Sequence, residues 1–110
     1  MKVQSSTIEN KYLRVKSINI GACLYEVYDK QKKINLILNL GPTKNYSSKN
    51  FYVGATCGRY AGRISNSKFN IKNKIYKLDG NEGKNTLHGG KIGFDRLEWK
   101  IHQHSKNKII

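Results

Sequence analysis

The chain has 110 residues, 37% of them hydrophobic, and it carries 21 Lys and Arg against 7 Asp and Glu, for a net charge of +14. This length fits one small domain, and so low an apolar fraction requires either good patterning or a core shared with another chain. The sequence contains no apolar run of about eighteen residues, which excludes a transmembrane helix, and a cytoplasmic location is expected.

The charge is carried mainly by lysine. Seventeen of the cations are Lys and four are Arg, while Asn and Ile occur twelve times each. Lys, Asn and Ile rising together indicate a compositional bias of the source genome and a diffuse, solvated lysine surface. The alternative is a basic nucleic-acid-binding protein. Nucleic acid is the less favoured partner, because the seven tyrosines are scattered along the chain with no compact aromatic platform.

Strand-like alternation runs through the first half of the chain. The predicted strands are residues 11–20, with a slip in phase at Ser17, residues 21–29, and residues 34–40, with a polar turn before the last of them. No segment has the helical period with caps.

The second half predicts a hairpin over residues 67–78. Phe69 and Ile71 alternate before a tight turn at Asn73, and Tyr76 and Leu78 alternate after it. Residues 97–101 read as one more strand. The fold class is therefore all-β, and a layer of this size needs a facing sheet to bury its apolar side, which favours an incomplete domain.

Arg59 and Arg63 lie four residues apart in GRYAGRI, residues 58–64. A guanidinium is a planar fork of donors that suits two neighbouring oxygens, as on a sugar or a phosphate. Gly58 and Gly62 would let a ligand or a strand approach the backbone. The alternative is that both arginines make structural ion pairs or bonds to loop carbonyls.

Three histidines and two cysteines complete the candidate groups. His88 precedes Gly89 and Gly90, where it either presents its imidazole into a cavity or caps a turn. His102 and His104 lie two apart without a third ligand, so they are expected at the surface. Cys23 and Cys57 form no metal-binding motif and are expected to be free thiols, and no metal is expected.

The order of motifs resembles a known family. Residues 51–99 contain GRxAxRI, a Phe-containing hairpin, Asn-x-Leu-His-Gly-Gly, Gly-Phe-Asp and a Trp, in that order. This order is similar to the N-terminal third of the galactose mutarotases, or aldose 1-epimerases. Residues 18–38 resemble the opening strands of the same family, so the resemblance covers about residues 10–101.

The resemblance implies a fold and an activity. Residues 1–110 would form the N-terminal portion of a galactose mutarotase-like β-supersandwich, whose C-terminal two-thirds are absent. The family interconverts α and β anomers of aldohexoses without a cofactor, using one base at the C1 hydroxyl and one acid at the ring oxygen. Arg63 and His88 match its substrate-binding residues. Gly62 stands where the family usually has Asn, so it offers backbone groups but one sugar contact is lost.

The family's catalytic glutamate and acid histidine lie downstream of the LHGG motif, and no residue of this chain matches them. Glu82, Asp95 and Glu98 belong to turns or strand edges. A truncated or split gene product is therefore expected, inactive alone, with an aldohexose as substrate and a second polypeptide as a further partner. A non-catalytic carbohydrate-binding or regulatory module, with a sugar phosphate as a variant ligand, is the alternative; the sugar itself stays open.

Overall fold

The computed structural model describes residues 2–47, 52–102 and 104–110, and in these residues it has strands and short 3-10 helices but no α-helix. The predicted all-β class is thus confirmed. Four strands form one antiparallel sheet in the order β1-β2-β3-β4, and three separate strand pairs follow along the chain. The elements are β1 (Ser5–Glu9), β2 (Leu13–Ile18), β3 (Cys23–Asp29), β4 (Ile34–Asn35), η1 (Thr43–Tyr46), β5 (Arg63–Ile64), η2 (Ser65–Ser67), β6 (Lys68–Ile71), β7 (Lys74–Lys77), β8 (Thr86–Leu87), η3 (Phe94–Arg96), β9 (His104–Ser105) and β10 (Lys108–Ile109).

The slip in phase at Ser17 is a β-bulge. Lys16 pairs with Glu26, but Ser17 pairs with Leu24, so Tyr25 has no partner across β2. An extra residue on one strand lets the side-chain alternation change face. The Tyr25 ring contacts that of Tyr46, with centroids 5.6 Å apart, and its hydroxyl donates to the Gly41 carbonyl at 2.8 Å.

The core is small and lies under the four-stranded sheet. Ile18, Cys23 and Tyr46 are buried together, and Val3, Tyr25, Leu40 and Ala55 pack around them. Many large apolar side chains remain exposed, including Leu38 at 77% and Ile92 at 73%. Among the described residues, therefore, only a small share of the apolar side chains is buried in the core.

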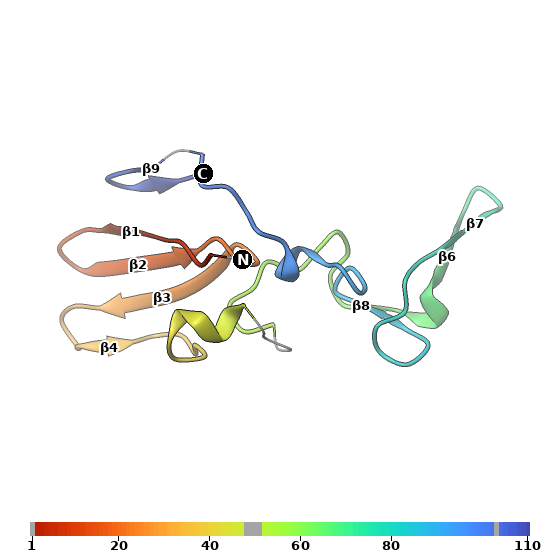
Figure 1. The fold of residues 1–110 in the computed structure, drawn as a ribbon, viewed down its shortest axis with the longest axis horizontal. Coiled ribbons are helices and arrows are strands. Elements are labelled where there is room, and N and C mark those ends of the chain that lie inside the picture. Colours follow the sequence, from red (N-terminus) through yellow and green to blue (C-terminus); the bar gives the residue numbers. More distant parts are fainter. Residues whose placement is uncertain (1, 48–51, 103) are drawn as a thin grey trace.

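The molecule is elongated, with principal extents of 53 × 27 × 25 Å (Figure 1). Its radius of gyration is 16.7 Å, whereas a compact chain of this length has about 13 Å. The sheet β1–β4 forms one end, and the β6–β7 hairpin projects at the other (Figure 1). The β5–β8 pair lies between them.

The predicted hairpin over residues 67–78 is confirmed. Phe69 pairs with Tyr76 across β6 and β7, and their rings stack with centroids 5.3 Å apart. Lys72 and Asn73 both have positive φ, of 48° and 63°. Two consecutive residues in this region make the tight turn that matches the twist of paired strands.

Two predicted strands are wrong over most of their length. Only Ile34–Asn35 of residues 34–40 is a strand. From Asn35 on, asparagine side chains bond to the backbone groups of β3 that a longer strand would pair with. Asn35 Oδ1 accepts the Val27 N–H at 3.0 Å, and Asn39 Nδ2 donates to the Tyr25 carbonyl at 3.3 Å. Such side chains compete with backbone pairing.

Residues 97–101 also do not form a strand. They make a single bridge, Glu98 to Ile20, after the turn of η3. The Trp99 indole folds back to donate to the Phe94 carbonyl at 3.0 Å, and its ring meets the Phe94 ring edge-on. This local packing ends the pairing after one bridge.

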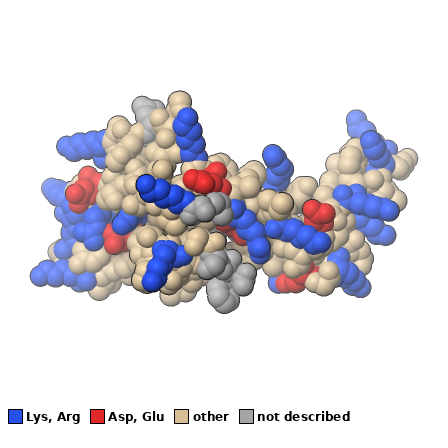
Figure 2. All heavy atoms as spheres, viewed as in Figure 1, with Lys and Arg blue, Asp and Glu red and all other residues tan. Residues whose placement is uncertain are grey.

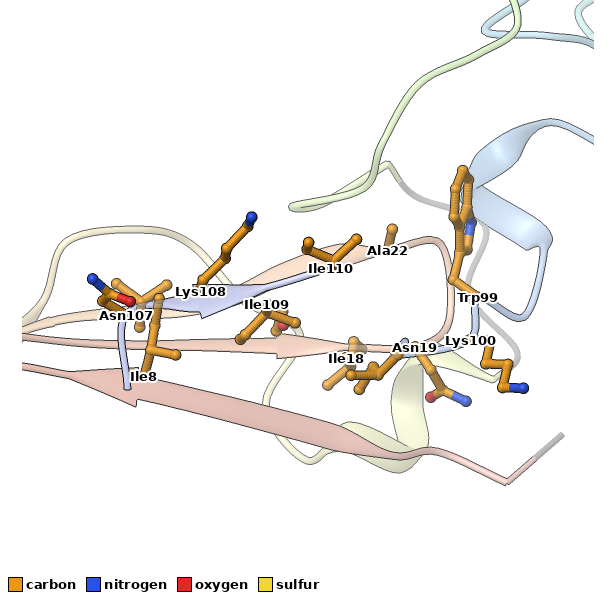
Figure 3. A pocket seen from close by; sticks show the side chains of 13 residues that line it. Ile8, Ile18, Asn19, Ala22, Trp99, Lys100, Asn107, Lys108, Ile109 and Ile110 are labelled. Carbon is orange, nitrogen blue, oxygen red and sulfur yellow. The ribbon is translucent and has the colours of Figure 1, made fainter. Parts of the chain in front are cut away.

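The C-terminal pair β9–β10 lies beside β1 and leaves a groove over the sheet (Figure 3). The groove has a volume of about 490 Å³ and a mostly apolar lining that includes Ile8, Ile18, Trp99, Ile109 and Ile110. His104 of β9 contacts β1, with its Nε2 2.8 Å from the Thr7 carbonyl oxygen. The C-terminal pair therefore covers only part of this face of the sheet, and apolar side chains on the face remain open in the groove.

Among the described residues, no helix has the length and apolar character needed to cross a membrane.

Candidate functional site

The two sequence motifs meet at the β5–β8 pair. Arg63 pairs with Leu87 and Ile64 with Thr86 in antiparallel register. One residue further, the His88 N–H donates to the Gly62 carbonyl at 3.0 Å. Arg63 and His88, twenty-five positions apart in the chain, therefore come from neighbouring positions of one short sheet.

Glycine is required where the two motifs touch. A Cβ built on Gly89 would lie 1.8 Å from the Gly58 carbonyl oxygen, and one on Gly58 would lie 2.4 Å from the Phe94 ring. The Phe94 N–H donates to that same Gly58 carbonyl at 3.0 Å. The glycines thus let the GRYAGRI, HGG and GFD segments pack backbone against backbone.

His88 is held in one orientation. Its Nδ1 accepts the Gly62 N–H at 3.0 Å, and its ring meets the Tyr52 ring edge-on with centroids 4.6 Å apart. Because Nδ1 is an acceptor, the proton of the neutral imidazole is assigned to Nε2. His88 therefore presents a single N–H donor on the side of the ring away from Gly62.

Arg63 makes a two-point ion pair with Glu82. Nε donates to Oε2 at 2.5 Å and Nη2 donates to Oε1 at 2.6 Å. The bond from Arg63 lowers the pKa of Glu82, burial opposes this change, and the charge of Arg63 lowers it further. The guanidinium and the carboxylate therefore form one cluster, and the His88 backbone lies one ladder position away.

The loop that carries Glu82 is fastened to β8. Asn81 Oδ1 accepts the Leu87 N–H at 2.7 Å, and its Nδ2 donates to the Leu87 carbonyl at 2.9 Å. Glu82 and Asn85 then close a tight turn through two backbone bonds. The Asn81 side-chain amide therefore bonds to Leu87 as the backbone of a neighbouring strand would. This contact places the next residue, Glu82, opposite Arg63.

The open side of the cluster lies beside Gly62. A Cβ built on Gly62 would have nothing within 4 Å, and its φ is +75°. The Arg63 side chain is 61% exposed. An exposed guanidinium and a bare backbone at Gly62 thus lie next to each other in the chain, one ladder position from His88.

The structure separates Arg59 from Arg63. The Arg59 guanidinium lies 5.5 Å from the Phe94 ring centroid and lines a different hollow of about 310 Å³ with Tyr60, Ile92 and Leu97. His102 and His104 are exposed, as expected, Cys57 is a free thiol, and Cys23 is buried in the core. No cluster of His, Cys, Asp and Glu that could hold a metal occurs in the part of the chain that the structure describes.

Three groups near the site or beside it were not predicted from the sequence. Glu82 and Tyr52, which contact Arg63 and His88, carry no motif of their own. Tyr60, Phe69 and Tyr76 form a row of rings with centroid separations of 6.3 and 5.3 Å, although no compact aromatic group was expected. The hairpin register brings the last two together, which scattered positions in the sequence do not show.

Comparison with solved structures gives the fold. The chain matches a GalM/aldose epimerase homologue from Caenorhabditis elegans with a TM-score of 0.87 and 28% identity, covering 98% of this chain and 34% of that one. It matches galactose 1-epimerase from Lactobacillus acidophilus with a TM-score of 0.79 and 32% identity, covering 93% and 34%. The chain therefore has the fold of part of an aldose epimerase sandwich.

Comparison of sequences gives the family. The pattern of the aldose 1-epimerase family matches residues 4–110. The chain is 36% identical to aldose 1-epimerase from Haemophilus influenzae, over 96% of this chain and 32% of the relative, and 38% identical to galactose mutarotase from Sus scrofa, over 88% and 29%. The chain thus belongs to the aldose 1-epimerase family, and it spans about a third of the length of the curated relatives it matches.

Proposed function

We propose that this chain supplies the substrate-binding edge of an aldose 1-epimerase that interconverts the α and β anomers of a hexose such as galactose or glucose. The observation that carries the proposal is the pairing of β5 with β8, which brings Arg63 and His88 to neighbouring backbone positions beside the open space at Gly62. Membership of the family supports the reaction class.

The two side chains have complementary tasks in this proposal. The free edge of the Arg63 guanidinium donates to two neighbouring hydroxyls of the sugar. The His88 Nε2–H gives one directed bond near the ring oxygen, where charge develops as the ring opens. Both residues hold the sugar in place, and a separate base and acid move the protons.

We infer that the 110 residues alone do not catalyse the reaction. Glu82 is engaged by Arg63, Asp95 is buried, and Glu98 accepts a bond from Asn19 at 3.2 Å. His102 and His104 lie in the segment beside β1, away from the β5–β8 pair. None of these five described residues is therefore a free base or acid beside Arg63 and His88.

A second polypeptide is the proposed source of the missing groups. The chain exposes 7855 Å², whereas a compact monomer of this mass exposes about 6,200 Å². The surplus of about 1,650 Å² is twice the roughly 800 Å² that one partner buries in a standard interface. The apolar groove between the sheet and β10 is part of that surface (Figure 3).

Galactose titration followed by protein-observed NMR tests the binding role. Replacing Arg63 or His88 by Ala is expected to weaken binding about tenfold each, the loss of a bond from a well-placed donor. Arg14→Ala is the matched control, because Arg14 also pairs with a carboxylate, Glu26, at 2.6 Å but lies in the first sheet. Unchanged binding in both site variants would contradict the assignment.

Polarimetry of fresh α-galactose tests the catalytic role. The chain alone is expected to match the buffer rate. Mixing it with the part of the Haemophilus influenzae relative that follows the matched segment is expected to restore turnover, with that part alone as the control. Sugar binding without turnover in the mixture would instead favour the non-catalytic carbohydrate-binding module, and turnover by the chain alone would contradict the need for a partner.

A further inference from the structure

We infer that Glu82 is a positioning residue for substrate binding, which holds the Arg63 guanidinium side-on so that its opposite edge faces the sugar. The inference rests on the proposed function. It adds to the two motif residues a third, which contacts Arg63 and not the sugar.

The pairing uses one particular edge of the guanidinium. Glu82 takes Nε–H and one Nη2–H of Arg63. The side chain of arginine has five N–H donors in a fixed plane. The three that remain, two on Nη1 and one on Nη2, lie on the end of the fork, which is the edge that can bridge two adjacent hydroxyls.

Glu82 is itself held on both sides. Before it, the Asn81 amide is bonded to both backbone groups of Leu87, directly across from Arg63 in β5. After it, Asn85 N–H donates to the Glu82 carbonyl at 2.9 Å, and Asn85 Oδ1 accepts the Asn66 N–H at 3.2 Å. The carboxylate is therefore fixed relative to the same sheet that carries the arginine.

The exposure of the pair separates positioning from stability. The side chains are 61% and 37% exposed, and exposed ion pairs contribute little to folding. Holding two long, exposed side chains in one geometry costs conformational entropy in the free protein. The same ordering then need not be made when the sugar binds, which favours binding. The pair is thus expected to affect ligand binding much more than unfolding.

The experiment compares galactose affinity and thermal unfolding in the wild-type chain, Glu82→Gln and Glu26→Gln. Glu82→Gln is expected to bind galactose about tenfold more weakly with an unchanged unfolding midpoint. Glu26→Gln removes the same charge from the Arg14 pair, and its affinity should match the wild type. The Arg63 Nε–H resonance should shift only in the Glu82 variant.

A double variant shows whether Glu82 acts through Arg63. Glu82→Gln combined with Arg63→Ala is expected to bind no more weakly than Arg63→Ala alone. A further loss in the double variant would overturn the inference, because it would place Glu82 on the sugar. Binding that depends on Arg63 but survives Glu82→Gln would overturn the inference alone, whereas no galactose binding by the wild-type chain would overturn the proposed function and this inference with it.

Discussion

Gly62 is the residue at which the resemblance to the aldose 1-epimerases implies an Asn. Its positive φ of +75° is one that Asn tolerates, and open space surrounds the missing Cβ. Gly62→Asn is expected to fold with a stability within about 1 kcal/mol of the wild type and to bind galactose several-fold more tightly through the added amide. Gly62→Ala is the matched control, since it has the same backbone requirement without the amide, and equal affinities of the two variants would contradict the added contact.

The pH dependence of binding isolates the charge on Glu82. The bond from Arg63 lowers the pKa of Glu82 below its ordinary value of 4.5, against a smaller opposing effect of burial. A lowered pKa means that the pair is present above the ordinary value and is lost as the pH falls through the folded-state value. Galactose affinity of the wild type is therefore expected to converge with that of Glu82→Gln as the pH falls below about 4.5 and Glu82 is protonated. A difference between the two that persists unchanged after Glu82 is protonated would contradict this assignment.

At the scale of single residues, the sequence reaches the motif members but not their neighbours. Arg63 and His88 stand out because their spacing and flanking glycines match a family. Glu82 does not, because the reason for its position is the Asn81 contact with Leu87, a bond between a side chain and a backbone that no periodicity marks. Arg59 looks equivalent to Arg63 in the sequence, yet it packs against Phe94.

The loop element that follows β7 depends on Asn81. Asn81→Ala would leave both backbone groups of Leu87 without their amide partner, at a cost of about 1–3 kcal/mol for part-buried groups. The expected result is faster amide exchange at Leu87 and weaker galactose binding, as Glu82 loses its anchor. Asn70→Ala, an exposed position on β6, is the control. Unaltered exchange at Leu87 would show that the β5–β8 pair holds the loop without Asn81.

Elements defined by local alternation were predictable, and elements decided by side-chain bonds were not. The β6–β7 hairpin follows from its pattern and from turn residues that adopt positive φ. Residues 34–40 have an equally regular pattern, but Asn35 and Asn39 bond to β3 through their amides and end the strand. The bulge at Tyr25 was visible only as a slip in phase, on the opposite strand.

At the scale of the whole molecule, the positive charge is spread and not gathered. Lysines and arginines are distributed over the sheet, the middle and the hairpin on the face shown in Figure 2. The acidic side chains are few and several are engaged, as in the pairs Glu9–Lys30, Arg14–Glu26 and Arg63–Glu82. A diffuse surface of this kind repels itself, and on the face shown in Figure 2 the cations of the described residues do not gather along one line.

The salt dependence of stability and binding follows from this distribution. Unbalanced like charges destabilise a folded chain, and salt screens them with a Debye length of about 10 Å at 0.1 M. The thermal unfolding midpoint is therefore expected to rise as salt increases from about 50 to 200 mM, with a smaller rise when Lys68, Lys72 and Lys77 of the exposed hairpin are changed to Gln. Galactose affinity, which involves an uncharged ligand, should hardly change over the same range. A midpoint that falls with salt would contradict dominant self-repulsion, and tight binding of a single-stranded oligonucleotide that weakens about a thousandfold or more over this range would favour a nucleic-acid partner instead.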